Sequence, residues 1–324
     1  RAGRACGGTW GEGGVCGVDG GTSYCGVASD EYRVAHPEWA LDALTVCTES
    51  STAGCTTSEA GAGYAETDFV LYVTSGQSSL CAGSTLAYAS TCVRDQFDRP
   101  IFGHANFCPS KLDTTPSAME EQLSTAVHEV LHALGFSSAS WPLFRDDYGA
   151  PRTPRDAAGN VPLQSYTCPD GTTGFHRVPA ESTIKVSTER GVGVARMVTP
   201  RVTAVGRDLF GCDSLEGVEL ENQPTAASCL GSHWEQRLFM YELMASTSAH
   251  HAVYSALTLA ALEDSGWYRA NYSVAQPLLW GREKGCAFAT AGCITPSGAA
   301  QDGRHFCTEP MQAGGTADLR ARGY

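Results

Sequence analysis

The chain has 324 residues and a formal net charge of −13. Hydrophobic residues make up 42% of it and charged residues 18%, a balance that is typical of a folded protein and excludes a disordered chain. The acidic surplus, without clusters of lysine and arginine, excludes nucleic acid as a partner, because neutralising phosphates requires clustered cations.

Fourteen cysteines are spread along the whole sequence, and no two of them form a C-x-x-C pair. That spacing excludes a zinc ribbon and a thioredoxin-like redox site. An even number of scattered cysteines indicates an oxidising compartment and up to seven disulfides, so we expect a secreted or cell-surface protein. No stretch reaches the ~20 apolar residues of a transmembrane helix. Asn271 opens an N-x-S sequon and is the candidate glycosylation site of a glycoprotein.

The first 63 residues are rich in glycine, and we expect them to be rich in loops. Three strands are predicted next, at residues 68–74, 86–89 and 101–107, from short apolar and β-branched runs. The third is the candidate edge strand that would hold a peptide in an extended form through main-chain hydrogen bonds. Its contacts would be Gly103, His104 and Ala105, with an ordinary core strand as the equal alternative.

A helix is predicted directly after these strands. Ser117 and Glu120 form a capping box, and Gly135 ends the helix because glycine accepts the left-handed conformation. Apolar residues recur at steps of three and four and predict one buried face: Met119, Leu123, Val127, Val130, Leu131 and Leu134.

The remaining chain is predicted to be irregular from residue 137 to about 231, with a β-like piece at 182–186. Helices are expected at 233–243 and 252–264. We expect three segments: an N-terminal part at 1–136, a central part at 137–283, and a short cysteine-rich part at 284–324.

The sequence His128-Glu129-Val130-Leu131-His132 is an HExxH motif on the predicted helix. Two histidines four residues apart lie on one helical face, so both imidazoles can reach one metal ion. Zinc suits neutral imidazole and keeps an open position for water. Glu129 can then take a proton from the zinc-bound water and deliver it to the leaving amine. Two core histidines beside a surface glutamate are the alternative interpretation of the pentapeptide alone.

The third ligand is not given by the motif. With Gly135 the segment resembles the metzincins, whose extended pattern is HExxHxxGxxH, but Ser138 stands where the last histidine would be. Glu263, on the predicted helix at 252–264, would suit a gluzincin arrangement. His233 is favoured because Met244 follows it in Glu-Leu-Met-Ala-Ser, which resembles the Met-turn of the metzincins.

This combination resembles the leishmanolysin family (peptidase family M8), and the matching segments cover roughly residues 67–293. The resemblance implies an α+β metzincin-like catalytic domain, with a mixed twisted sheet, an active-site helix, an inserted central region and a short cysteine-rich C-terminal part. It implies the following roles: His128, His132 and His233 as ligands of one catalytic Zn2+, Glu129 as general base, and Met244 as the Met-turn residue.

The expected function is therefore that of a secreted zinc endopeptidase that acts as a monomer on protein or peptide substrates. Ala245 and Tyr254 are candidates for the wall of the pocket beside the scissile bond. A catalytically silent relative that binds or adheres is one alternative. A gluzincin-type metallohydrolase with Glu263 as the third ligand is the other.

Overall fold

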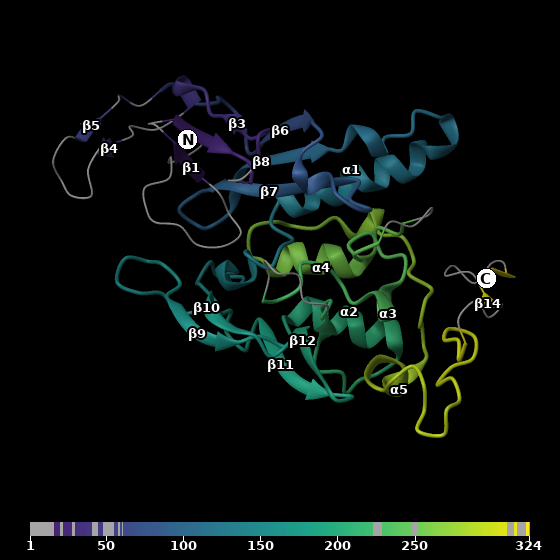
Figure 1. Ribbon diagram of the computed structural model, residues 1–324. Helices are drawn as coiled ribbons and strands as arrows, with labels where there is room; N and C mark the ends of the chain where they lie inside the picture. The colour runs from purple at the N-terminus through teal and green to yellow at the C-terminus, as the bar shows by residue number, and fades with distance from the viewer. Residues whose placement is uncertain are drawn as a thin grey trace. The chain divides into compact units, whose positions relative to one another are not determined.

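The computed structural model describes residues 16–19, 22–27, 30–40, 45–47, 55–57, 59, 61–222, 229–247, 252–309, 314–315 and 322–323. The chain divides into two compact units, Arg1–Ala139 and Ser140–Tyr324. Both contain helices and strands, which confirms the mixed α+β class (Figure 1). None of the helices in the described ranges is long and apolar enough to cross a membrane.

The first unit is built on a three-stranded mixed sheet of β6 (Val70–Ser75), β7 (Ala87–Arg94) and β8 (Pro100–Phe107). These are the three strands that the sequence predicts. Their order is β6-β8-β7, with β6 parallel and β7 antiparallel to β8. The central strand is therefore the last of the three in the chain.

The prediction that residues 101–107 form an edge strand is wrong. β8 pairs with β6 on one side and with β7 on the other, so its main-chain groups are not available to a peptide. His104 and Ala105 are buried. A Cβ atom on Gly103 would come within 2.8 Å of the Ala133 Cβ, so this glycine allows close contact between sheet and helix.

Helix α1 (Met119–Ala133) packs on β7 and β8, and the Thr91 hydroxyl donates to the Ala133 carbonyl at 2.9 Å. Its N-cap is Ala118, without a side-chain hydrogen bond, because the short 3-10 helix η4 (Pro116–Ala118) precedes it. The predicted capping box is therefore wrong. The predicted apolar face is buried only toward its end: Met119 is 64% exposed and Leu123 62%, whereas Leu131 is 5% exposed.

Small sheets occupy the part that was expected to be loop-rich. β1 (Cys16–Asp19), β2 (Thr22–Cys25) and β3 (Val34–Ala35) form one antiparallel sheet, and β4 (Thr45–Cys47) pairs with β5 (Cys55–Thr57). Short 3-10 helices lie at η1 (Glu38–Ala40), η2 (Ser79–Cys81) and η3 (Pro109–Lys111). A disulfide from Cys25 to Cys92 joins β2 to β7 in the core of this unit.

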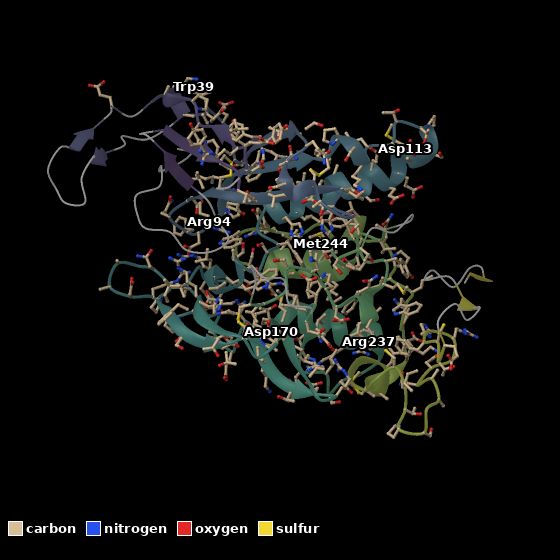
Figure 2. All side chains as sticks on the ribbon, in the orientation of Figure 1. Trp39, Arg94, Asp113, Asp170, Arg237 and Met244 are labelled. Carbon is tan, nitrogen blue, oxygen red and sulfur yellow. A yellow bond between two sulfur atoms is a disulfide. The ribbon has the colours of Figure 1, made fainter. Side chains whose placement is uncertain are left out.

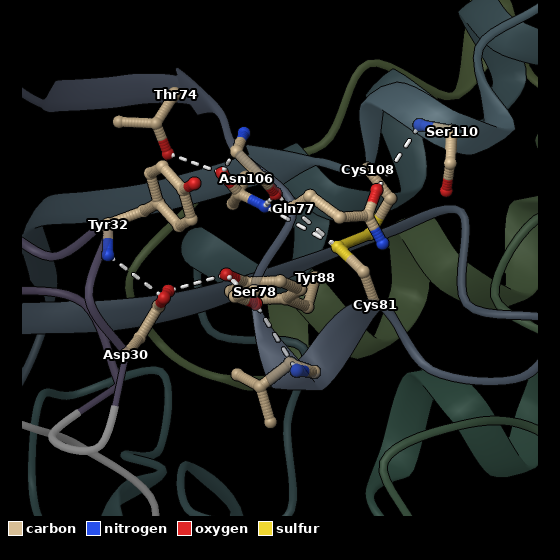
Figure 3. The surroundings of a disulfide bond; sticks show 12 residues. Asp30, Tyr32, Thr74, Gln77, Ser78, Cys81, Tyr88, Asn106, Cys108 and Ser110 are labelled. Carbon is tan, nitrogen blue, oxygen red and sulfur yellow. Dashed lines mark hydrogen bonds between the residues drawn. A yellow bond between two sulfur atoms is a disulfide. The ribbon is translucent and has the colours of Figure 1, made fainter.

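The ends of β6 and β8 are held by Asn106 and by the disulfide Cys81–Cys108 (Figure 3). The Asn106 amide donates to the Gly76 carbonyl and accepts from the Gly76 N–H, both at 2.9 Å. The Thr74 hydroxyl donates to the same amide oxygen at 2.8 Å. Because every polar atom of this buried amide has a partner, it stabilises one strand arrangement.

The second unit contains regular structure where the sequence predicts irregular chain. β9 (Leu163–Thr167) and β10 (Thr173–Arg177) form a hairpin; β11 (Ile184–Glu189), β12 (Val192–Met197) and β13 (Val218–Glu219) form a sheet. Helix α2 (Pro200–Phe210) begins with proline at its first position and ends at Gly211, whose φ is 63°. Buried Asp264 accepts the N–H groups of Arg201 and Val202 at its start.

Three shorter helices complete this unit: α3 (Gln236–Phe239), α4 (Ala256–Asp264) and α5 (Gly285–Thr290). The predicted helix at 233–243 is only one turn long, and the one at 252–264 begins after a Ser255 cap. The short elements η5 (Trp141–Leu143), η6 (Tyr272–Val274), β14 (Gly314–Gly315) and β15 (Arg322–Gly323) are also present. Disulfides join Cys168 to Cys229 and Cys212 to Cys286.

Candidate metal centre

The last turns of α1 carry the two histidines of the HExxH motif. His128 and His132 lie one turn apart, and their Nε2 atoms are 2.9 Å apart. Two ligands of one tetrahedral zinc ion at about 2.0–2.1 Å would have nitrogen atoms roughly 3.3 Å apart. The two imidazoles therefore converge on one point in the manner required of a pair of ligands.

The end of α1 fixes the tautomer of His132. Gly135 has a φ of 109°, its N–H donates to the His132 carbonyl at 3.0 Å, and the Phe136 N–H donates to the Leu131 carbonyl at 2.9 Å. These two bonds are a Schellman motif, as the predicted stop at Gly135 requires. The turn brings the Phe136 carbonyl within 2.6 Å of His132 Nδ1. Because a carbonyl only accepts, the proton is on Nδ1 and the lone pair is on Nε2.

Glu129 lies between the two histidines in the sequence. It is 6% exposed, and within the described residues its Oε2 atom is buried without a hydrogen-bond partner. Burial raises the pKa of Glu129 to about 8. A buried carboxyl that lacks partners costs stability, and such groups concentrate at functional sites.

In the second unit, His233 is oriented by a carboxylate that the sequence analysis did not identify. His233 Nδ1 donates to Glu221 Oε1 at 2.8 Å, and the Ser232 N–H donates to the same oxygen at 2.9 Å. Burial alone would raise the pKa of Glu221, but these donors outweigh burial and hold it below its usual value. This bond assigns the proton to Nδ1 and the lone pair to Nε2, which is the pattern of a metal-binding histidine.

Met244 lies on a tight turn and is fully buried; its position is labelled in Figure 2. The Trp234 N–H donates to the Met244 carbonyl at 2.9 Å, and Trp234 pairs with Ala245 in an isolated parallel bridge. The turn is thus attached to the residue that follows His233. The segment before His233 is also held in place: the Trp141 indole N–H donates to the Gly231 carbonyl at 3.0 Å.

The other candidate residues lie in varied surroundings. Glu263 lies 3.7 Å from Arg201 Nε and accepts a hydrogen bond from Tyr272, so its charge is already compensated. Ala245 is buried and Tyr254 is half-buried, and the main-chain N–H of Tyr254 donates to Gln276 Oε1 at 3.0 Å. Asn271 is exposed at the start of η6. The roles of these residues stay predictions.

A second group of potential ligands, one histidine and two cysteines, is excluded as a metal site while its cysteines form a disulfide. Cys168, His176 and Cys229 have potential ligand atoms close together. The two sulfur atoms are joined in a disulfide, which removes the thiolates that would bind a metal.

Comparison with known proteins identifies the family of this chain. The family model of leishmanolysin, peptidase family M8, matches residues 35–146 and 171–318. A leishmanolysin-like peptidase of Drosophila pseudoobscura pseudoobscura is 42% identical over 285 residues, which are 84% of this chain and 40% of that protein. A protein of the same name from Caenorhabditis elegans is 44% identical over 248 residues, 74% of this chain and 36% of that protein.

Leishmanolysin of Leishmania major is 34% identical over 253 residues, 78% of this chain and 35% of that protein. The chain thus spans 40% or less of the length of these three relatives. Because the family match covers most of the sequence, the chain belongs to the leishmanolysin family of metallopeptidases.

Proposed function

We propose that this chain is the catalytic part of a zinc endopeptidase in which His128, His132 and His233 hold one zinc ion. The observation that carries the proposal is the convergence of two Nε2 atoms, 2.9 Å apart, beside a buried carboxylate on one helix. Two ligand nitrogens of one tetrahedral zinc ion lie about 3.3 Å apart, which is close to the separation of these two atoms. The convergent pair therefore supports a metal site over the structural alternative.

The second unit supports His233 as the third ligand through its own geometry. Glu221 fixes the tautomer in which Nε2 carries the lone pair, and a carboxylate partner also makes the imidazole more basic. The Met244 turn is bonded to the next residue of the same segment. The alternative, Glu263, is ion-paired with Arg201, so using it as a ligand would leave that arginine without one of its carboxylates.

Zinc bound by three imidazoles supplies a Lewis acid and lowers the pKa of water to about 7. The protein itself supplies the proton transfers. The pKa of the nearby Glu129 carboxyl would be lowered by a zinc ion held by the three histidines, against the effect of its burial. Its Oε2 atom, which is buried and has no partner among the described residues, would then accept the proton of the attacking water and return it to the departing amine. His132 is held by the Phe136 carbonyl and His233 by Glu221, so these imidazoles keep their orientation during the reaction.

Protein or peptide chains are the proposed substrates, with Ala245 and Tyr254 as candidates for the wall of the side-chain pocket. An oxidising compartment is the proposed location, because four disulfides occur among the described residues. The exposed Asn271 sequon fits secretion and glycosylation.

A catalytically silent relative would be expected to lose the general base or a ligand, and here all four residues are retained. The test combines zinc analysis with cleavage of a peptide library by three variants. We expect His233→Ala to lose zinc and activity. Glu129→Ala should keep zinc but lose hydrolysis by roughly two to four orders of magnitude. Glu263→Ala should keep both.

Two results would contradict the proposal. Full zinc content and activity in His233→Ala, with loss of both in Glu263→Ala, would establish the gluzincin alternative. An unmodified chain that binds zinc but cleaves no member of the library would favour the silent relative.

A further inference from the structure

A fully buried carboxylate, Glu242, lies two residues before Met244 in the second unit. It is 1% exposed and accepts several hydrogen bonds. Its Oε2 accepts the Met244 N–H at 2.5 Å. Its Oε1 accepts the hydroxyls of Ser255 at 2.7 Å and Thr258 at 2.6 Å. Neither the HExxH motif nor the proposed reaction uses this group.

The direction of these bonds follows from the other partners of the two hydroxyls. Ser255 Oγ already accepts the Leu257 N–H at 3.2 Å, as the cap of α4. Thr258 Oγ1 already accepts the Trp234 indole N–H at 3.0 Å. Each hydroxyl therefore directs its own proton to Glu242, which acts only as an acceptor. An ionised carboxylate meets that requirement, whereas an amide of the same size brings its own donors.

Together with Trp234, these hydrogen bonds form a closed ring. Its indole N–H reaches Glu242 by way of Thr258, while its main-chain N–H donates to the Met244 carbonyl at 2.9 Å. The Met244 N–H in turn donates to Glu242. We call this closed set of Trp234, Glu242, Met244 and Thr258 the Glu242 circuit. All four side chains are at most 1% exposed, so water does not substitute for a lost bond.

We propose that Glu242 is a positioning residue for the metal centre, because the Glu242 circuit fixes the backbone from which His233 projects. The inference rests on the proposed role of His233 as a ligand. Trp234 follows His233 directly, and the circuit holds it through both of its N–H groups. A loosened Trp234 would let the His233 imidazole leave the position in which Glu221 aligns it.

The principal variant is Glu242→Gln, which keeps the volume of the side chain but places an amide NH2 group against one of the donors that Glu242 accepts. We expect the zinc dissociation constant of the full chain, measured by chelator competition, to rise about 10- to 100-fold. The cobalt(II)-substituted variant should also show a changed absorption spectrum, because the ligand geometry changes. The matched control is Glu216→Gln, an exposed glutamate of the same unit whose salt bridge is with exposed Lys185, and it should leave both readouts unchanged.

Thr258→Val breaks the same circuit at its link to the indole without altering the carboxylate. We expect a similar loss of zinc affinity, and the double variant should lose hardly more than either single one, because both changes open one circuit. If Glu242→Gln does not fold, Thr258→Val carries the test alone. If the losses of zinc affinity in the two single variants multiply in the double variant, the two residues act independently and the circuit is refuted.

The outcomes separate this inference from the proposed function. Zinc affinity and cobalt spectrum unchanged in folded Glu242→Gln, with a lower free energy of unfolding, would show a purely structural role and overturn the inference alone. Unchanged zinc affinity in His233→Ala would overturn the ligand assignment and this inference with it. Loss of zinc in His233→Ala together with weakened zinc in Glu242→Gln supports both.

Discussion

Replacing Gly103 by alanine adds one methyl group at the place where α1 lies closest to the sheet. The new Cβ would lie 2.8 Å from both the Ala133 Cβ and the Phe69 Cζ, and 3.2 Å from the Ser90 carbonyl oxygen. Carbon atoms in contact prefer about 3.5–4.0 Å. The last turn of α1 or the Phe69 ring must therefore move by roughly 1 Å.

The magnitude follows from two opposing effects. Overpacking a tight core costs about 1–3 kcal/mol. Alanine restricts the unfolded chain more than glycine does, and this effect stabilises the folded state by about 0.4–1 kcal/mol. We expect Gly103→Ala to lower the free energy of unfolding by about 1–2 kcal/mol. Because Ala133 follows His132 directly, the shifted turn should also weaken zinc binding.

Urea unfolding of the metal-free chain, followed by circular dichroism, measures this loss. The control is Gly303→Ala, where an added Cβ meets no atom within 4 Å and the backbone is not left-handed. The control should change the free energy of unfolding by less than about 0.5 kcal/mol. If Gly103→Ala is as stable as the control, α1 does not press on β8, and the account of this glycine is refuted.

Three further predictions follow from other residues. Glu221→Gln should raise the zinc dissociation constant about tenfold or more, because His233 Nδ1 loses its charged acceptor, and chelator competition giving an unchanged constant would refute this orienting role. Burial lowers the pKa of His36 to about 4 from 6.5, so the unfolded chain binds the proton more tightly and stability is lost as pH falls below about 6.5. Between pH 7 and pH 5 the unmodified chain should lose roughly 2 kcal/mol more unfolding free energy than His36→Leu does. If urea unfolding gives equal losses for both chains, the role of His36 is refuted. Thiol titration of the unreduced, denatured chain should detect Cys293, which is unpaired in the described part of the chain, and the signal should fall in Cys293→Ser; an unchanged signal would mean that Cys293 is paired.

The even number of cysteines, which allows up to seven disulfides, does not determine which of them pair. An even number of cysteines is compatible with complete pairing, but pairing also needs Cα atoms about 4.4–6.8 Å apart. The four described disulfides meet this condition, with Cα separations of 4.9–5.6 Å. That distance is a property of the fold and not of the composition.

Local sequence determined the helix and its end. The spacing of His128 and His132 places both imidazoles on one helical face whatever the surroundings, and Gly135 is a stop because its backbone accepts the left-handed region. Helix α2 is not predicted although Pro200 and Gly211 bracket it, because the Pro- and Gly-rich composition of this region favours irregular chain. Strands β9, β10 and β12 are not predicted for the same reason, whereas the β-like piece predicted at 182–186 overlaps β11.

Only the tertiary structure decided which partner each segment has. Strand order depends on pairing between distant segments, so residues 101–107 proved central although their sequence is equally compatible with an edge. Glu221 and Glu242 carry no local signal, because their partners other than the Met244 N–H come from segments 11 to 16 residues away along the chain. Sequence could name the chemistry of a zinc peptidase from residues one turn apart. The carboxylates that orient such residues became visible only once folding had brought separate segments into contact.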